Sequence, residues 1–206
     1  AYDRASIRIG TRFIGNGDRA RLLSKVVALT GMPASGKGEI STIAKERGWA
    51  IHRIGALVWA ETERQGLDLT PSNVGNIANG EREAHGMNIW AIRSIPIIKE
   101  LLANGSNVLI DGMRGIPEQK TFKATFDNDL VTLAVISSFD IRLARAMSRK
   151  RIDDGAESDF RERDKRELSW NLKEAIDLTE RKIINESSLE NYHFEINAFL
   201  TEMESS

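Results

Sequence analysis

The residues with the clearest chemical potential form a glycine-rich turn between an apolar run and a helical pattern. The run VVALT is followed by GMPASGKGE, which spans residues 31–39. Glycines at such a junction let backbone N–H groups surround a phosphate at a helix N-terminus, and Lys37 adds a mobile cation for the outer phosphates. An ordinary turn is the alternative, but it explains poorly why these turn residues and a lysine gather there. We therefore interpret the segment as a phosphate-binding loop (P-loop). The residues assigned to nucleotide binding are Gly31, Pro33, Ala34, Ser35, Gly36, Lys37, Gly38 and Glu39, of which Lys37 is also catalytic.

A carboxylate ends a second apolar run, VLID, at Asp111. A parallel strand delivers such a residue to the carboxyl edge of the sheet, beside the P-loop, where it can hold Mg²⁺ through a bound water. Arg114 follows and offers a bidentate fork to an acceptor phosphate. A strand that ends in Asp-Gly is also a common turn, but its position after a P-loop favours the functional interpretation. We assign Asp111 to catalysis and the metal site, and Arg114 to acceptor binding.

Arginines are dense between residues 139 and 166, where Asp153-Asp154-Gly155 separates two helical patterns. An exposed helix commonly carries such charges as a solvated face, and we expect this role for about half of them. Phosphoryl transfer, however, needs cations that close over the triphosphate and exclude water. We predict a closing lid at residues 149–165. The candidate catalytic arginines, in this lid and just before it, are Arg145, Arg149 and Arg151.

A long polar and helical segment occupies residues 55–105 and carries Arg82 and Arg93. The structural interpretation is a set of helices with surface arginines. The segment is longer than a simple crossover between two strands needs, which favours a functional role. We predict an acceptor-binding insertion here, with Arg82 and Arg93 as acceptor ligands.

Apolar strands and helical patterns alternate along the chain. Strand-like segments follow the P-loop at residues 50–54, 107–110, 130–137 and 182–185. Near-continuous apolar strands separated by helices favour a parallel sheet covered on both faces. With the strand before the P-loop, they predict a P-loop NTPase fold of the nucleotide-kinase type. This is a three-layer α/β/α arrangement around a mainly parallel five-stranded sheet.

Three local signals refine this prediction. Thr70-Pro71 predicts a helix start, because a capping side chain precedes a proline in the first turn. Pro96 lies inside a helical pattern at residues 89–102 and predicts a bend or an interruption. The four tryptophans are assigned to packing; they are Trp49, Trp59, Trp90 and Trp170.

Composition limits the function. The 206 residues suffice for one sizeable α/β domain, placed at residues 25–206, and the net charge of −1 gives no general attraction to nucleic acid. No apolar run is long enough to cross a bilayer, so we expect a small-molecule acceptor as partner, and neither nucleic acid nor membrane. The absence of cysteine excludes thiolate sites and fits a cytoplasmic location. His52, His85 and His193 lack metal-ligand spacing and are assigned structural or surface roles.

Residues 1–24 form a separate N-terminal extension. Ile7, Ile9 and Phe13 alternate with polar residues, and Asn16-Gly17 is a turn signal. This pattern predicts a strand or hairpin laid on a sheet edge or on a partner chain. We expect an arm without a catalytic part that is available for homo-oligomer formation.

The P-loop resembles that of adenylate kinases, which reads G-x-P-x-x-G-K-G. In that family glycine also follows the lysine, and the metal can be held through water. This chain has Ala34 where that loop has its second glycine, and Glu39 where it has threonine. Ala34 would be strained if its backbone needs a positive φ.

From residue 25 almost to its end, the chain resembles the UPF0200 family of small archaeal adenylate-kinase-related proteins, relatives of nucleoside monophosphate kinases and dephospho-coenzyme A kinase. The matching stretches, in chain order, are TGMPASGKG, GLDLTPSNVG, EREAHGM, IDGMRG, RDKRELSW and IINESSLE. The resemblance implies ATP and Mg²⁺ as cofactors and places Asn185 and Ser187 near the adenine. The chain departs from the family at Gly38, where serine is usual, and at Ala56 and Trp59, where an acid and an arginine would orient an acceptor.

These features predict a kinase that transfers the γ-phosphoryl group of Mg-ATP to a small nucleotide or nucleotide-like acceptor, such as a nucleoside monophosphate or dephospho-coenzyme A. The alternative is a nucleotide-binding sensor or partner-binding protein with degenerate transfer activity, favoured by the departures at Gly38, Ala56 and Trp59. A third possibility is ATP hydrolysis coupled to a partner.

Overall fold

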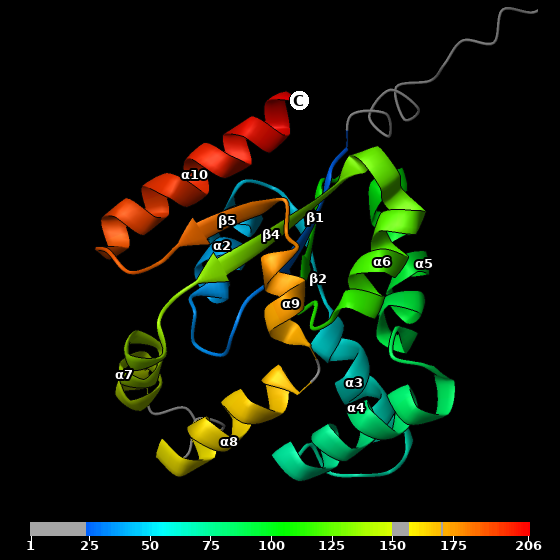
Figure 1. Cartoon of the computed structure of the whole chain (residues 1–206). Coiled ribbons are helices and arrows are strands. Elements are labelled where there is room, and N and C mark those ends of the chain that lie inside the picture. Colours follow the sequence, from blue (N-terminus) through cyan, green and yellow to red (C-terminus); the bar gives the residue numbers. More distant parts are fainter. Residues whose placement is uncertain (1–23, 150–156, 170) are drawn as a thin grey trace, which may run out of the picture.

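The computed structural model describes residues 24–149, 157–169 and 171–206. Five strands form one sheet in the order β2-β3-β1-β4-β5, and all four pairings are parallel. The strands are β1 (Val26–Thr30), β2 (Ala50–Arg53), β3 (Val108–Asp111), β4 (Leu130–Ile136) and β5 (Arg181–Ile184). The predicted parallel five-stranded α/β fold is therefore confirmed (Figure 1).

Helices connect successive strands, and one more helix follows the last strand. They are α2 (Lys37–Glu46), α3 (Ile54–Arg64), α4 (Pro71–His85), α5 (Ile89–Ala103), α6 (Ile116–Phe126), α7 (Phe139–Arg149), α8 (Glu157–Leu168), α9 (Leu172–Asp177) and α10 (Leu189–Ser205), with a 3₁₀ turn η1 (Asp127–Asp129) before β4. The predicted insertion at residues 55–105 folds as α3, α4 and α5. Part of the predicted lid and the N-terminal arm, residues 150–156 and 1–23, lie outside the described residues.

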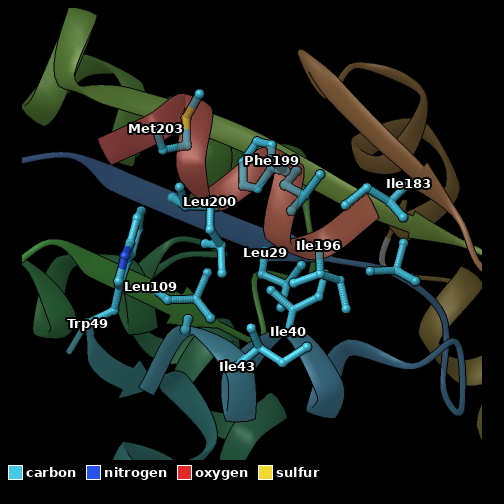
Figure 2. Close-up of a cluster of buried hydrophobic side chains, with 14 of the residues drawn as sticks. Leu29, Ile40, Ile43, Trp49, Leu109, Ile183, Ile196, Phe199, Leu200 and Met203 are labelled. Carbon is cyan, nitrogen blue, oxygen red and sulfur yellow. The ribbon is translucent and has the colours of Figure 1, made fainter. Parts of the chain in front are cut away.

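Two apolar clusters cover the two faces of the sheet, because side chains of a strand alternate between faces. Val27 and Leu29 face α2 and α10 in the first cluster, which Figure 2 shows. Val26 and Ala28 face α3, α4, α5 and α6 in the second. The central strand β1 is buried throughout, so the P-loop that follows it starts from a fixed point in the core.

The helix signals in the sequence are mostly confirmed. Thr70 caps α4, where its Oγ1 accepts a hydrogen bond of 3.2 Å from the Asn73 N–H, and Pro71 occupies the first turn. Pro96 does not interrupt α5, which continues to Ala103. Among the described residues, no helix combines the length and the apolar character needed to cross a membrane.

The tryptophan assignments are confirmed in part. Trp90 is completely buried and Trp49 nearly so. Trp59 is 56 % exposed, so its assignment to packing was wrong. The neighbouring Val58 takes the buried side of α3 instead. Trp170 lies outside the described residues.

Replacing Trp90 with alanine should lower the free energy of unfolding by about 3–5 kcal/mol, because it empties a buried volume in the second cluster. Trp59→Ala is the matched control and should change it by less than about 0.5 kcal/mol, since this side chain faces solvent. Urea unfolding followed by circular dichroism measures both. Equal losses in the two variants would contradict the assignment of the core.

Candidate functional site

Backbone conformation gives the P-loop its shape. Gly31 and Gly36 have φ of 145° and 111°. A Cβ at Gly36 would lie 2.2 Å from Nδ2 of Asn185, and one at Gly31 would lie 2.7 Å from the Val135 carbonyl oxygen. Ala34 has φ of 60°, which is the strained conformation considered above. The loop ends where α2 begins at Lys37, and the first N–H groups of a helix lack partners within it.

Side chains from the last strand and helix bind carbonyl groups of this loop. Asn185, just after β5, donates from Nδ2 to the Ser35 carbonyl at 2.8 Å. The hydroxyl of Tyr192 in α10 donates to the Gly36 carbonyl at 3.1 Å. Burial raises the pKa of Tyr192, so its hydroxyl stays protonated as a donor. Asn185, placed near the adenine by resemblance, therefore supports the loop itself.

Two arginines of α7 also contact the loop. Nη1 of Arg145 lies 3.4 Å from the Ser35 carbonyl oxygen. Nη2 of Arg145 donates to the backbone carbonyl oxygen and to the side-chain Oδ1 of Asn185, each at 3.0 Å. Arg142, which sequence analysis did not select, donates to the Pro33 carbonyl at 3.1 Å and is 4 % exposed. The Asp164 carboxylate in α8 pairs with Arg142. This pair links α7 and α8 to the loop, at the end of the molecule beyond the β4 arrowhead in Figure 1.

Lys37 bends back over its own loop. Its Nζ donates to the carbonyls of Gly31 at 2.5 Å and Met32 at 2.9 Å. Burial lowers the pKa of Lys37 to about 8, and the nearby Glu167 carboxylate opposes that shift. Phosphate oxygens are stronger acceptors for this ammonium than neutral carbonyls. A phosphate in the loop would therefore draw Nζ away from them.

Asp111 lies beside the loop, as predicted, because β3 pairs with β1 and sets Asp111 opposite Leu29. The buried hydroxyl of Ser41 donates to Oδ2 of Asp111 at 3.3 Å. Gly38, where many P-loops carry a metal-ligating hydroxyl, is exposed with open space around its missing Cβ. Asp111 and Ser41 fit a metal held through water. Among the described residues, no group of three or more acidic or histidine side chains could hold one directly.

Six charged groups form what we call the charge cluster: Arg82, Arg114, Arg163, Asp111, Glu118 and Glu167. Arg114 pairs with Glu167, which also lies 3.5 Å from Arg163. Arg82 is 3.4 Å from Glu118, and both are buried. Burial alone would raise the pKa of Glu167, but Arg114, Lys37 and Arg163 hold it below its ordinary value.

The remaining predicted residues are placed as follows. Arg93 pairs with Glu81 at 2.5 Å and stacks over Trp90. Neither of these two partners belongs to the charge cluster. Glu39 points to His193 in α10, 3.0 Å away. Ser187 is exposed and accepts from Nδ2 of Asn191 at 3.0 Å. The side chain of Arg149 and the whole of Arg151 lie outside the described part of the chain.

A groove of about 1060 Å³ runs along the β2 edge of the sheet. Ser41 and Arg53 line it, and both approach Asp111, with Nε of Arg53 at 3.8 Å from Oδ2. His52 also lines the groove; it is 7 % exposed, and burial lowers its pKa, which keeps it neutral near pH 7. The groove therefore lies next to two side chains that contact Asp111, at the open edge of the sheet.

Sequence reasoning missed several of these residues. They are Ser41, Glu118, Arg142, Asp164, Glu167 and Tyr192. One signal was present in the sequence. Arg142 and Arg145, like Asp164 and Glu167, stand three residues apart, which puts each pair on one helix face.

The lowered pKa of Lys37 predicts pH-dependent ATP binding. The ammonium form binds phosphate, so affinity should be nearly constant below about pH 7 and fall by up to about tenfold per unit above about pH 8. Arginine stays protonated there, so Lys37→Arg should remove the dependence. Calorimetric titration with Mg-ATP measures both proteins. A pH-independent affinity of the native protein across that range would contradict this assignment.

Comparisons with known proteins identify the family and the fold of the chain. Residues 30–169 match an AAA domain. The UPF0200 protein of Methanosarcina acetivorans is 36 % identical over 180 residues, covering 86 % of this chain and 95 % of the relative. The UPF0200/UPF0201 protein of Archaeoglobus fulgidus is 38 % identical over 180 residues, which are 87 % of this chain but 56 % of that protein.

Among solved structures, a gluconokinase from Sinorhizobium meliloti superposes with a TM-score of 0.56 at 16 % identity. The match covers 89 % of this chain and 95 % of that one. At this identity it supports the fold alone. On the sequence relationship to its archaeal relatives, the chain belongs to the UPF0200 family, and it has the fold of P-loop kinases.

Proposed function

We propose that this protein is a P-loop phosphotransferase that moves the γ-phosphoryl group of Mg-ATP to a small nucleotide or nucleotide-like acceptor, such as a nucleoside monophosphate or dephospho-coenzyme A. One observation carries the proposal. Lys37 and the N-terminus of α2 lie beside Asp111, at the carboxyl end of adjacent parallel strands. This is where α/β folds bind phosphorylated ligands. An ATP-dependent reaction and a cysteine-free chain fit the cytoplasm.

Each residue would have a distinct role. The loop amides and Lys37 would hold the β- and γ-phosphates, while Arg145, fixed against Ser35 and Asn185, would balance charge in the transition state. Mg²⁺ supplies charge neutralisation when bound. Asp111 and Ser41 would hold its water in place. Holding the reactants in line accounts for much of the rate, since phosphoryl transfer needs little covalent chemistry from the protein.

A nucleotide-binding sensor without useful transfer is the second candidate. Gly38 offers no hydroxyl to the metal, and Ala34 keeps a strained backbone where glycine would be free of strain. A sensor would bind ATP but transfer its γ-phosphoryl group poorly. The sensor and the kinase therefore differ in turnover, not in ATP affinity.

Turnover is tested by ADP production from Mg-ATP with AMP, CMP, dCMP, UMP and dephospho-coenzyme A, and with a blank that contains no acceptor. We expect acceptor-dependent ADP that falls at least about 100-fold in Lys37→Ala, because the phosphates lose the cation that lies over the loop. Lys120→Ala, an exposed lysine of α6, is the control and should keep full activity. ADP at the blank level in protein that binds ATP would favour the sensor.

The metal assignment makes a separate prediction. Ser41→Ala should raise the Mg²⁺ concentration needed for half-maximal ADP production several-fold, about 1 kcal/mol, because Asp111 loses its hydrogen-bond donor. Gly38→Ser should lower that concentration, since open space surrounds the position. Ser205→Ala, at the end of α10, is the control. An unchanged Mg²⁺ requirement in both site variants would remove Ser41 from the metal site.

A further inference from the structure

Arg142 and Asp164 form a buried pair beside the P-loop that has no role in the proposed transfer. We infer that this pair fixes the orientation of one peptide of the loop, so that the Ala34 N–H points to the phosphates of the bound nucleotide. Arg142 is then a positioning residue for ATP binding, because it acts through the loop and not on the ligand. The inference rests on the proposed function only for the identity of that ligand.

Residues 32–35 of the loop form a tight turn. The Ser35 N–H donates to the Met32 carbonyl at 3.2 Å. Pro33 occupies the second position of the turn, and Ala34 in the third position has φ of 60°. A positive φ directly after proline identifies a type II turn, whose third position favours glycine. The turn therefore has alanine where its conformation favours glycine.

A type I turn is the alternative conformation for this sequence. It differs from type II by a rotation of the central peptide through about half a turn, and its third residue has a negative φ. Alanine favours the negative φ, because a positive φ brings its Cβ close to backbone atoms. The turn residues alone therefore favour the rotated peptide, and a contact from elsewhere must oppose that rotation.

The hydrogen bond from Arg142 selects between the two conformations, because they differ in the direction of the Pro33 carbonyl. Nη1 of Arg142 donates to this carbonyl at 3.1 Å. In the rotated peptide the carbonyl would turn away, and a buried donor and acceptor would lose each other. A trans peptide directs its carbonyl and its N–H to opposite sides. The same hydrogen bond therefore turns the Ala34 N–H away from Arg142.

The side that the Ala34 N–H faces is the phosphate side of the loop. The carbonyls of Pro33, Ser35 and Gly36 all accept hydrogen bonds from supporting side chains. The N–H groups of the same peptides consequently point away from those side chains. Several loop amides that point to a common side are what a P-loop needs to bind a phosphate.

The remaining contacts of Arg142 keep its guanidinium in place. The Asp164 carboxylate pairs with it, with Oδ2 at 3.2 Å from Nη2, and the Ser137 carbonyl accepts from Nε at 3.1 Å. The ring centres of Phe139 and Phe160 lie 5.5 and 5.9 Å from its central carbon. A planar guanidinium held on its edges and faces is a preorganised donor. It cannot follow the loop carbonyl if the peptide rotates.

This arrangement makes residue 34 and Arg142 interdependent. Glycine adopts a positive φ without strain, so a turn with glycine at position 34 would keep its form without help from Arg142. With alanine at this position, the hydrogen bond from Arg142 opposes the preference of the turn. The contribution of Arg142 to nucleotide binding should therefore depend on the residue at position 34.

Nuclear magnetic resonance tests the peptide orientation without any nucleotide. The Pro33 Hα and the Ala34 amide proton are close in a type II turn and distant in a type I turn, so their cross-peak reports the rotation. Arg142→Met combined with Asp164→Leu, called the double variant, removes the donor and leaves no unpaired charge at the buried pair. We expect this cross-peak to be strong in the native protein and to fall by at least about threefold in the double variant.

Arg142→Lys is a second, milder variant for the same measurement. It keeps a cation for Asp164 but lacks the fork that binds Asp164 and the loop together, so the cross-peak should also weaken. A weak cross-peak in the native protein, or one that neither variant reduces, would overturn the inference.

A cycle of variants measures the coupling to nucleotide binding. Calorimetry with Mg²⁺ and the non-hydrolysable ATP analogue AMP-PNP compares the native protein, the double variant, Ala34→Gly and the combination of all three changes. The two changes at the pair should weaken binding by at least about tenfold when residue 34 is alanine, and by less than about threefold when it is glycine. Equal losses with alanine and with glycine would show that the pair only stabilises the fold, and would overturn the inference.

Arg161→Met is the matched control for the binding measurement. It removes an exposed arginine of α8 and should leave the affinity for Mg-AMP-PNP unchanged. Native protein that does not bind Mg-AMP-PNP would refute the proposed function, whereas the cross-peak would still decide whether Arg142 sets the peptide. Normal binding together with a cross-peak that is insensitive to Arg142 would refute this inference alone.

Discussion

The site depends on one constraint, which is that a loop whose amides point inward to a phosphate must turn its carbonyls outward. Buried carbonyls without partners are costly, so each needs a donor from elsewhere. This loop obtains them from Asn185, Tyr192, Arg142, Arg145 and its own Lys37. The carbonyl partners therefore hold the loop open for phosphate before any ligand arrives, and four of them come from the second half of the chain.

This constraint explains how distant elements meet at one place. Arg142 binds the loop and Asp164 together, which sets α8 beside the carboxyl ends of the strands. Glu167, one helical turn further on, then reaches Arg114 and the neighbourhood of Lys37. Asp164, which supports the loop through Arg142, and Glu167, which belongs to the charge cluster, thus lie on one face of α8. A change that moves α8 should therefore affect the P-loop and the charge cluster together.

Much of the fold was predictable from the sequence, because its signals are local. The order of strand, glycine-rich loop and helix, and the Thr70 cap, depend on neighbouring residues only. Contacts between side chains within the site were harder to predict from the sequence. Arg142 and the Pro33 carbonyl are 109 residues apart, and Ser41 and Asp111 are 70 apart. A sequence shows that a charged or polar residue exists, but not which group it meets. Trp59 illustrates the same limit, since it was assigned to packing, and its place on the exposed face of α3 became visible only in the structure.

Hydrogen exchange at the amides of residues 34–38, measured with and without Mg-AMP-PNP, tests the central claim most directly. If the loop holds the phosphates, these amides donate hydrogen bonds to the nucleotide, and exchange should slow by at least about tenfold. The Ser35 N–H already donates to the Met32 carbonyl at 3.2 Å and should change least. Amides at the far end of α10 should not change. Nucleotide binding that leaves residues 34–38 unprotected would contradict the account, because the phosphates would then lie elsewhere.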